Sequence, residues 1–273
     1  MKVVILAAGY ATRLTEVTDN GKIAKTLLPI EVNGKQKPIL HFLLDKVQAL
    51  PNVDQLIVIT NSLYIKNIYN SINEYSKQNN PTWLPTILTD GTIKAPATGA
   101  NFALQMANEE IDQDYPDDIL VMASDNYFEF SLLDMYYQQQ QLKANYGDDV
   151  NQIACKTYPK KDKEFIAKNF GLLQTTANNQ VVALQEKPGL KGIEPKSTNV
   201  SLALYMLNRP DLSLIEEYMS TATGKARDSI GLFINYLVQN TSSFAYPIRG
   251  KFLDIGTPEE YYSIAPYTSR FKI

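Results

Sequence analysis

Hydrophobic and polar positions follow two different patterns along the first half of the chain. Short apolar runs, which are typical of buried strands, are separated by longer segments whose apolar residues recur at helical spacing. Leu40, Leu43, Leu44 and Val47 show this helical spacing just after Pro38. Such alternation predicts an α/β fold with a mixed, mainly parallel sheet covered on both faces. The expected strands are 3–6, 55–60, 84–89 and 119–123, and the expected helices are 38–50, 62–77, 98–111 and 132–142.

From about residue 150 onward, extended runs dominate the pattern. Asn178 and Asn179 form a turn signal between two of these runs. The sequence contains no internal repeat and no long linker, so we expect one domain over residues 1–273, with a substrate-binding lobe added from about residue 150. The expected strands are 153–158, 170–175, 180–185, 200–207 and a strand-loop at 251–258, and the expected helices are 211–220, 229–238 and one beginning at 259.

Composition narrows the class of protein. The 273 residues are 44% hydrophobic, enough for a full core, and no run approaches the roughly 20 apolar residues of a spanning helix. The apolar run 3–8 is too short for a signal peptide, and a single cysteine, Cys155, excludes an internal disulfide. These features predict a cytoplasmic protein without a membrane partner. A net charge of −3 and the lack of a polybasic run give no support for nucleic-acid binding.

The first apolar run ends in a turn of small residues around Gly9, followed by Thr12 and Arg13, and Lys25 comes shortly afterwards. A strand that ends in such a loop can turn its backbone N–H groups toward a phosphate, and the two cations can hold the anion. The glycine spacing fits neither the dinucleotide fingerprint nor the P-loop. An ordinary turn between a strand and a helix is the alternative interpretation of the glycine alone.

Two aspartates lie where a metal could bind. Asp125 directly follows the apolar run 119–123, and Asp254 lies between Leu253 and Ile255. Ligands of α/β proteins bind at the carboxyl ends of strands, and a carboxylate between apolar residues needs a partner or a metal. A solvated loop or a helix cap is the alternative for Asp125. Thr257, which precedes Pro258 and two glutamates, is expected to be a helix cap.

Three further segments complete the pattern. Glu186 and Lys187 end an expected strand at Pro188, although a plain turn would give the same sequence. Residues 90–92 and 97–100 form a loop of small residues that could let a flat nucleobase approach the backbone, although a plain turn would also explain them. His41, the only histidine of the chain, is expected to be packed or exposed rather than to act as a base.

Together and in this order, these segments resemble the sugar-1-phosphate nucleotidyltransferases, also called nucleotide-sugar pyrophosphorylases, of the small glucose-1-phosphate thymidylyl or uridylyl type. The resemblance covers nearly the whole chain. It implies a Rossmann-like three-layer nucleotidyltransferase fold with a nucleotide-binding half, 1–150, and a sugar-phosphate-binding half, 151–273. The segments that carry it are 6–14, Lys25 with 27–29, 124–126, 170–171, 186–188 and 253–257.

The resemblance also implies an enzyme and its reaction. A nucleoside triphosphate, with UTP or dTTP favoured, would react with a sugar-1-phosphate in the presence of Mg²⁺, giving a nucleotide sugar, a polysaccharide precursor, and pyrophosphate. A homodimer is the working expectation. The implied catalytic residues are Arg13, Lys25 and Lys187, the nucleotide contacts are Leu6, Ala8, Gly9, Thr12, Thr98 and Gly99, the sugar-phosphate contacts are Asn126, Gly171, Glu186 and Lys187, and the Mg²⁺ ligands are Asp125 and Asp254.

The chain departs from the family pattern at four places. Many members have glycine where this chain has Ala11 and proline where it has Ala24. Members of the thymidylyl type have Thr-Gly at Leu202-Ala203 and a glutamine near Thr89 or Asp90. The last two departures concern the sugar-phosphate contact and the base preference.

Two other functions stay open from the sequence. A cytidylyltransferase acting on phosphocholine or another alcohol phosphate would keep the fold, and a choline site would need an aromatic cage, for which Tyr158 and Tyr205 are candidates. A nucleotide-binding regulatory module of the same fold would have lost the chemistry, although binding alone does not need both metal carboxylates. A dehydrogenase is disfavoured by the glycine spacing.

Overall fold

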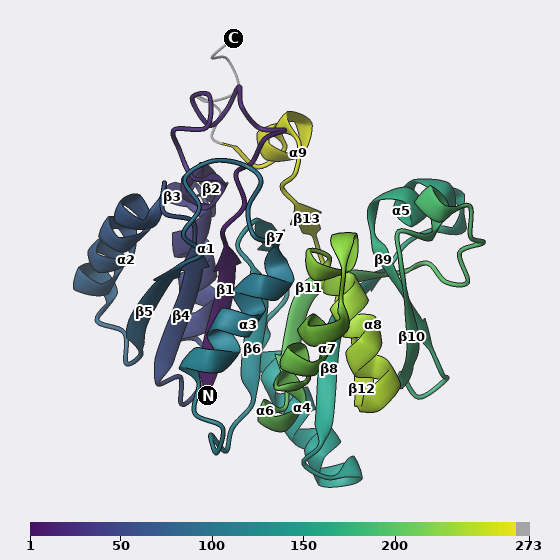
Figure 1. Cartoon of the computed structure of the whole chain (residues 1–273). Helices are drawn as coiled ribbons and strands as arrows, with labels where there is room; N and C mark the ends of the chain where they lie inside the picture. The colour runs from purple at the N-terminus through teal and green to yellow at the C-terminus, as the bar shows by residue number, and fades with distance from the viewer. Residues whose placement is uncertain (266–273) are drawn as a thin grey trace. The chain divides into compact units, whose positions relative to one another are not determined.

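The structure is a computed structural model that describes residues 1–265 (Figure 1). The chain forms two compact units. Unit 1 consists of residues 1–99, residues 123–132 and the described part of the chain from 250 onward. Unit 2 consists of residues 100–122 and 133–249. Each unit therefore contains segments that are far apart in the sequence.

Unit 1 is built on three parallel strands, β1 (Lys2–Ala7), β4 (Gln55–Thr60) and β5 (Leu84–Thr89), which run side by side in Figure 1. Strand β1 pairs with β4, and β4 pairs with β5. The apolar residues 56–59 of β4 are fully buried, as expected for a strand of a parallel sheet with both faces covered. The predicted strands are confirmed, and those at 55–60 and 84–89 have the predicted bounds.

Unit 1 also contains three α-helices within the described residues, α1 (Ile39–Gln48), α2 (Ile65–Asn79) and α9 (Pro258–Tyr262). Helix α1 begins directly after Pro38 and buries its apolar stripe. Helix α9 begins with a capping box in which the Thr257 hydroxyl accepts from the backbone N–H of Glu260. The prediction that Thr257 is a helix cap is confirmed.

Two short strand pairs in unit 1 were not predicted as pairs, although one of their strands, 252–254, lies within the predicted strand-loop at 251–258. Strands β2 (Pro29–Val32) and β3 (Lys35–Pro38) flank Asn33 and Gly34, which both have positive φ. Asn-Gly between two extended runs is a strong hairpin signal, so the sequence did contain this information. Strand β7 (Asn126–Phe128) pairs with β13 (Phe252–Asp254) from the far end of the chain, and no local pattern specifies such a pairing.

The sheet of unit 2 is arranged around β11 (Asn199–Leu207). This strand pairs antiparallel with three others, β9 pairs antiparallel with β10, and β12 pairs parallel with β8. Parallel and antiparallel ladders together make the mixed sheet that was expected. The other strands of the unit are β6 (Ile119–Ala123), β8 (Val150–Thr157), β9 (Gly171–Thr175), β10 (Val181–Glu186) and β12 (Ser242–Pro247), the last of which was not predicted.

The helices of unit 2 largely follow the predicted pattern. The helix expected at 211–220 is divided at Ser213, because Pro210 starts a first short helix and Ser213 ends it. Helix α5 lies in a lysine-rich segment without a clear apolar stripe and was missed. The helices are α3 (Ala100–Glu110), α4 (Leu132–Tyr146), α5 (Lys163–Asn169), α6 (Arg209–Leu212), α7 (Leu214–Thr221) and α8 (Ile230–Asn240).

Cys155 lies in β8 and is buried, and burial raises the pKa of its thiol to about 12. A thiol with such a pKa stays protonated and unreactive, which is typical of a small core residue. No helix within residues 1–265 is long and apolar enough to cross a bilayer.

Two alanines adopt the left-handed backbone conformation that favours glycine. Ala11 has φ +50° and Ala203 has φ +49°. Ala203 lies in β11, where the pairing with β8 shifts register between Ser201 and Tyr205. These are two of the positions at which the chain departs from glycine in the family pattern. The backbone therefore keeps a glycine-type geometry, at a strain cost of roughly 1–2 kcal/mol for each alanine.

The Ala203→Gly variant is expected to raise the free energy of unfolding by about 0.5–1 kcal/mol, because it relieves the left-handed strain and loses only part of the gain to backbone entropy. Ala154, buried in β8 and outside the left-handed region, is the matched control, and Ala154→Gly should lower stability by about 1 kcal/mol. Urea unfolding of both variants measures the difference. Equal destabilisation by the two substitutions would contradict the strain argument.

Candidate active site

The loop after β1 in unit 1 is hydrogen-bonded to the residue that directly follows β4. The buried Asn61 donates from its amide to the carbonyl of Ala8 (3.0 Å) and accepts from the N–H of Tyr64 (3.1 Å). The backbone N–H groups of residues 9–13 donate no hydrogen bond to any other residue of the described chain, and Gly9 is exposed. These groups are therefore available to an anionic ligand.

Four charged side chains gather beside this loop, although they come from distant parts of the sequence. Lys25, in the short 3₁₀ helix η1 (Lys25–Leu27), forms an ion pair with Asp125 that leaves these side chains 15% and 24% exposed. The pairing of β7 with β13 brings Asp254 to this place, and the N–H of Ile255 donates to the carbonyl of Asp125 (3.0 Å). Arg13 is close enough to lower the pKa of Asp254.

Asp254 has a pKa of about 6, well above that of an ordinary aspartate. Burial is the main cause, and the negative charge of Asp125 raises the pKa further, whereas Lys25 and Arg13 lower it. Two carboxylates in one partly buried place repel each other, so a cation between them would be stabilised. No group of three acidic, histidine or cysteine ligands exists within residues 1–265. Two carboxylates supplemented by phosphate oxygens and water are the donor set that suits Mg²⁺, so these residues fit the implied metal.

Glu260 was not expected to take part in the site. Its carboxylate accepts from the backbone N–H groups of Gly256 and Thr257, both at 2.8 Å, and thereby fixes the loop that follows Asp254. The guanidinium of Arg13 lies over this loop, since a Cβ at Gly256 would be 3.0 Å from Nη2. The Thr-x-x-Glu spacing at 257–260 is the sequence signal that could have identified this residue.

The loop 90–98 is organised by the carboxylate of Asp90. It accepts from the backbone N–H (2.9 Å) and hydroxyl (2.7 Å) of Thr92 and from the hydroxyl of Thr98 (3.0 Å). The Tyr10 hydroxyl donates to Thr92 Oγ1 (2.8 Å) and so links this loop to the loop after β1. Gly99 follows with φ +100°. The structure thus brings the expected base-binding loop and the expected phosphate-binding loop into contact within unit 1.

In unit 2, the carboxylate of Glu186 lies in a slot between two glycines. Glu186 pairs with Gly171 across β10 and β9, and a Cβ at Gly171 would be 2.9 Å from Glu186 Oε2. A Cβ at Gly231, in the first turn of α8, would be only 2.0 Å from the same oxygen. Any larger residue at 231 must displace the carboxylate. Gly231 was missed because its contribution is the absence of a side chain, which no local sequence signal indicates.

The residues predicted for the site divide between the two units. Lys187 is exposed and follows Glu186 with a left-handed backbone, φ +44°. Asn126 is buried and starts β7 beside Asp125. Unit 1 contains Leu6, Ala8, Gly9, Thr12, Arg13, Lys25, Thr98, Gly99, Asp125, Asn126 and Asp254, and unit 2 contains Gly171, Glu186 and Lys187.

Comparison with solved structures finds the same fold in two sugar-nucleotide enzymes. A Bacillus anthracis protein assigned as a glucose-1-phosphate thymidylyltransferase, solved with sucrose, is 18% identical, with a TM-score of 0.72 over 96% of this chain and 93% of that chain. A UDP-glucose pyrophosphorylase solved with UDP-glucose is also 18% identical, with a TM-score of 0.71 over 96% of each chain. These matches confirm the α/β fold class with a mixed central sheet.

The family model described as nucleotidyl transferase matches residues 2–270 of this chain. This match spans both units and every residue of the predicted site. The chain is therefore a member of the nucleotidyl transferase family and a nucleotidyltransferase enzyme.

Proposed function

We propose that this enzyme transfers a nucleotidyl group from a nucleoside triphosphate, with UTP or dTTP favoured, to a sugar-1-phosphate, and that Mg²⁺ is its cofactor. The observation that carries the proposal is the cluster of Arg13, Lys25, Asp125 and Asp254 beside a loop with available N–H groups. The names of the two structural neighbours, a thymidylyltransferase of glucose-1-phosphate and a UDP-glucose pyrophosphorylase, support a sugar acceptor and a pyrimidine base.

The reaction needs no general base. An oxygen of the sugar-1-phosphate would form a bond to the α-phosphorus, and the bond from the α-phosphorus to the bridging oxygen of the leaving pyrophosphate would break. A phosphate monoester has its second pKa near 6, so the attacking group is largely a dianion at neutral pH. His41, the single histidine of the chain, is the side chain most suited to act as a general base, and its contacts do not require that role. Its Nε2 lies 3.0 Å from the carbonyl and hydroxyl oxygens of Ser71, and its ring packs against Tyr75.

The main task of the enzyme is to bring two anions together. Arg13 and the N–H groups of the loop after β1 would bind the triphosphate, and Lys25, oriented by Asp125, would stabilise negative charge near the reacting phosphates. Asp125 and Asp254 would hold Mg²⁺, which when bound neutralises phosphate charge. Lys187 would hold the phosphate of the sugar.

A sugar is favoured over choline as the acceptor. The carboxylate of Glu186, placed between Gly171 and Gly231, can accept hydrogen bonds from sugar hydroxyls. The two tyrosines considered for a choline cage do not form one: Tyr205 is 2% exposed, and the Lys156 ammonium lies 5.6 Å from the centre of the Tyr158 ring.

We further infer a role in nucleotide-sugar biosynthesis that supplies polysaccharide precursors. Cytoplasmic location, the homodimer and the functional division at residue 150 stay predictions.

Pyrophosphate release with Mg²⁺ tests the proposal directly. UTP, dTTP, CTP, GTP and ATP are each combined with several sugar-1-phosphates and with phosphocholine. We expect release with UTP or dTTP and one hexose-1-phosphate. Release only with CTP and phosphocholine would replace the sugar by an alcohol phosphate. Nucleotide binding without any release would favour the regulatory module.

Arg13→Ala and Asp125→Ala are each expected to lower kcat on the order of 10²-fold or more, because the first removes a cation beside the phosphates and the second removes a proposed Mg²⁺ ligand that also orients Lys25. Lys22→Ala is the matched control: it removes a cation from the same segment, but this lysine is exposed and, within residues 1–265, pairs only with Asp19. Steady-state kinetics of the three variants should show near-normal turnover only for Lys22→Ala. Normal turnover of either site variant would overturn the assignment.

Gly231→Ala is expected to raise KM for the sugar-1-phosphate about tenfold and to leave KM for the nucleotide unchanged, because the new Cβ displaces the Glu186 carboxylate. The displaced atom is the end of a flexible side chain, so the variant should fold. A double-mutant cycle provides the control: in a Glu186→Ala background, Gly231→Ala should have no further effect on KM. Additive effects of the two substitutions would show that Gly231 does not act through Glu186.

A further inference from the structure

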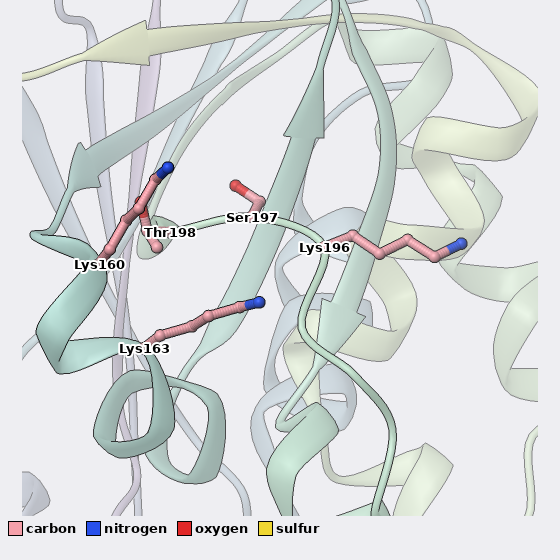
Figure 2. Close-up of a pocket in the computed structure, with 5 residues that line it drawn as sticks. All are labelled: Lys160, Lys163, Lys196, Ser197 and Thr198. Carbon is pink, nitrogen blue, oxygen red and sulfur yellow. The ribbon is translucent and has the colours of Figure 1, made fainter.

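A pocket in unit 2 is lined by residues that the proposed reaction does not use. Lys160, Lys163, Lys196, Ser197 and Thr198 surround a volume of about 310 Å³, and we call this site the lysine pocket (Figure 2). Lys160 lies in the 3₁₀ helix η2 (Lys160–Asp162) and Lys163 begins α5. The other three residues belong to the segment that leads into β11.

The lysine pocket lies in a basic segment of an acidic protein. Residues 158–198 contain seven lysines and four carboxylates, whereas the whole chain has a net charge of −3. Lys160 has no ion-pair partner within residues 1–265. Lys163 pairs with Glu194 (2.8 Å), which is 84% exposed. An exposed pair of this kind contributes only about 0–1 kcal/mol, so an incoming anion can replace the carboxylate.

The polar groups of the pocket suit a phosphate. Figure 2 shows the side chains of Lys160 and Lys163 extending into the space beside Ser197 and Thr198, whereas the ammonium of Lys196 points away. Ser197 Oγ accepts from the N–H of Asn199 (2.9 Å), which leaves its O–H to donate to a ligand. Two ammonium groups and two hydroxyls thus offer donors to the several acceptor oxygens of one phosphate.

We propose that the lysine pocket binds the phosphate group of a phosphorylated small molecule, through residues distinct from all those assigned to nucleotidyl transfer. The volume is at the lower end of small-molecule sites and leaves room for a body of sugar size beside the phosphate. This binding chemistry does not depend on the proposed reaction.

The pocket is also connected to the strand that carries Glu186. The side chain of Gln185 accepts from the N–H of Lys196 (2.9 Å) and donates to the carbonyl of Glu194 (3.3 Å). The segment that lines the lysine pocket is therefore tied to the residue next to Glu186. A ligand that rearranges this segment would act on the end of β10.

Phosphate binding is measured by isothermal titration calorimetry in an Arg13→Ala background, so that the loop after β1 contributes little. The probes are inorganic phosphate and glucose 6-phosphate. We expect saturable binding that the Lys160→Gln/Lys163→Gln variant weakens at least about tenfold, because two charge-assisted hydrogen bonds are lost. Tighter binding of glucose 6-phosphate than of phosphate would identify a sugar phosphate as the ligand, and equal binding would identify free phosphate.

Two further variants separate the pocket from general charge effects. Lys161→Gln/Lys191→Gln removes the same charge from exposed neighbours outside the pocket and should leave affinity within about twofold. Glu194→Gln frees Lys163 and should strengthen binding about two- to fivefold, a gain that misfolding cannot produce. Absence of saturable binding, equal weakening by both lysine pairs, or no gain from Glu194→Gln would overturn the proposal.

Discussion

The repulsion between Asp125 and Asp254 is the constraint on which the proposed nucleotide site depends. The backbone ladder between β7 and β13, together with the hydrogen bond from the N–H of Ile255 to the carbonyl of Asp125, keeps the two segments side by side. The burial of Asp254 strengthens the repulsion and raises its pKa to about 6, and only the nearby charges of Lys25 and Arg13 oppose this shift. A site built in this way gains free energy when a cation arrives, and the same two basic residues then remain available to the phosphates.

Two kinds of constrained backbone position occur in this chain: alanines with left-handed geometry, and a glycine against which a side chain packs. Ala11 and Ala203 keep left-handed geometry although they are not glycines, which indicates that the surrounding structure imposes this conformation. Gly231 keeps open the slot in which the Glu186 carboxylate lies. At Ala11 and Ala203 the backbone is strained, and at Gly231 the missing side chain leaves room for the carboxylate. Both arrangements position groups that the core alone would not position.

The sequence predicted best what depends on local patterns. Strands 55–60, 84–89 and 119–123 were predicted with their observed bounds, and the first and last of them are buried apolar runs of the kind expected in a covered sheet. The loop around Gly9 was identifiable because its glycine, threonine and arginine are neighbours in the sequence. The pairing of β7 with β13, and the contact of Gly231 with Glu186, join residues that are far apart and carry no local signal. These contacts arise only when the chain folds, so they had to be read from the structure.

Net charge gives a misleading picture of this protein, because the balance differs from place to place. In the nucleotide site, cations compensate two carboxylates, whereas around the lysine pocket the cations are in excess. The hydrogen bonds of Gln185 to both Glu194 and Lys196 tie that cationic segment to the end of β10. Lys163 is therefore connected to Glu186 through its ion pair with Glu194, the hydrogen bonds of Gln185 and the peptide bond between Gln185 and Glu186. Local charge placement, rather than overall charge, is therefore what would allow both proposed sites to select anions.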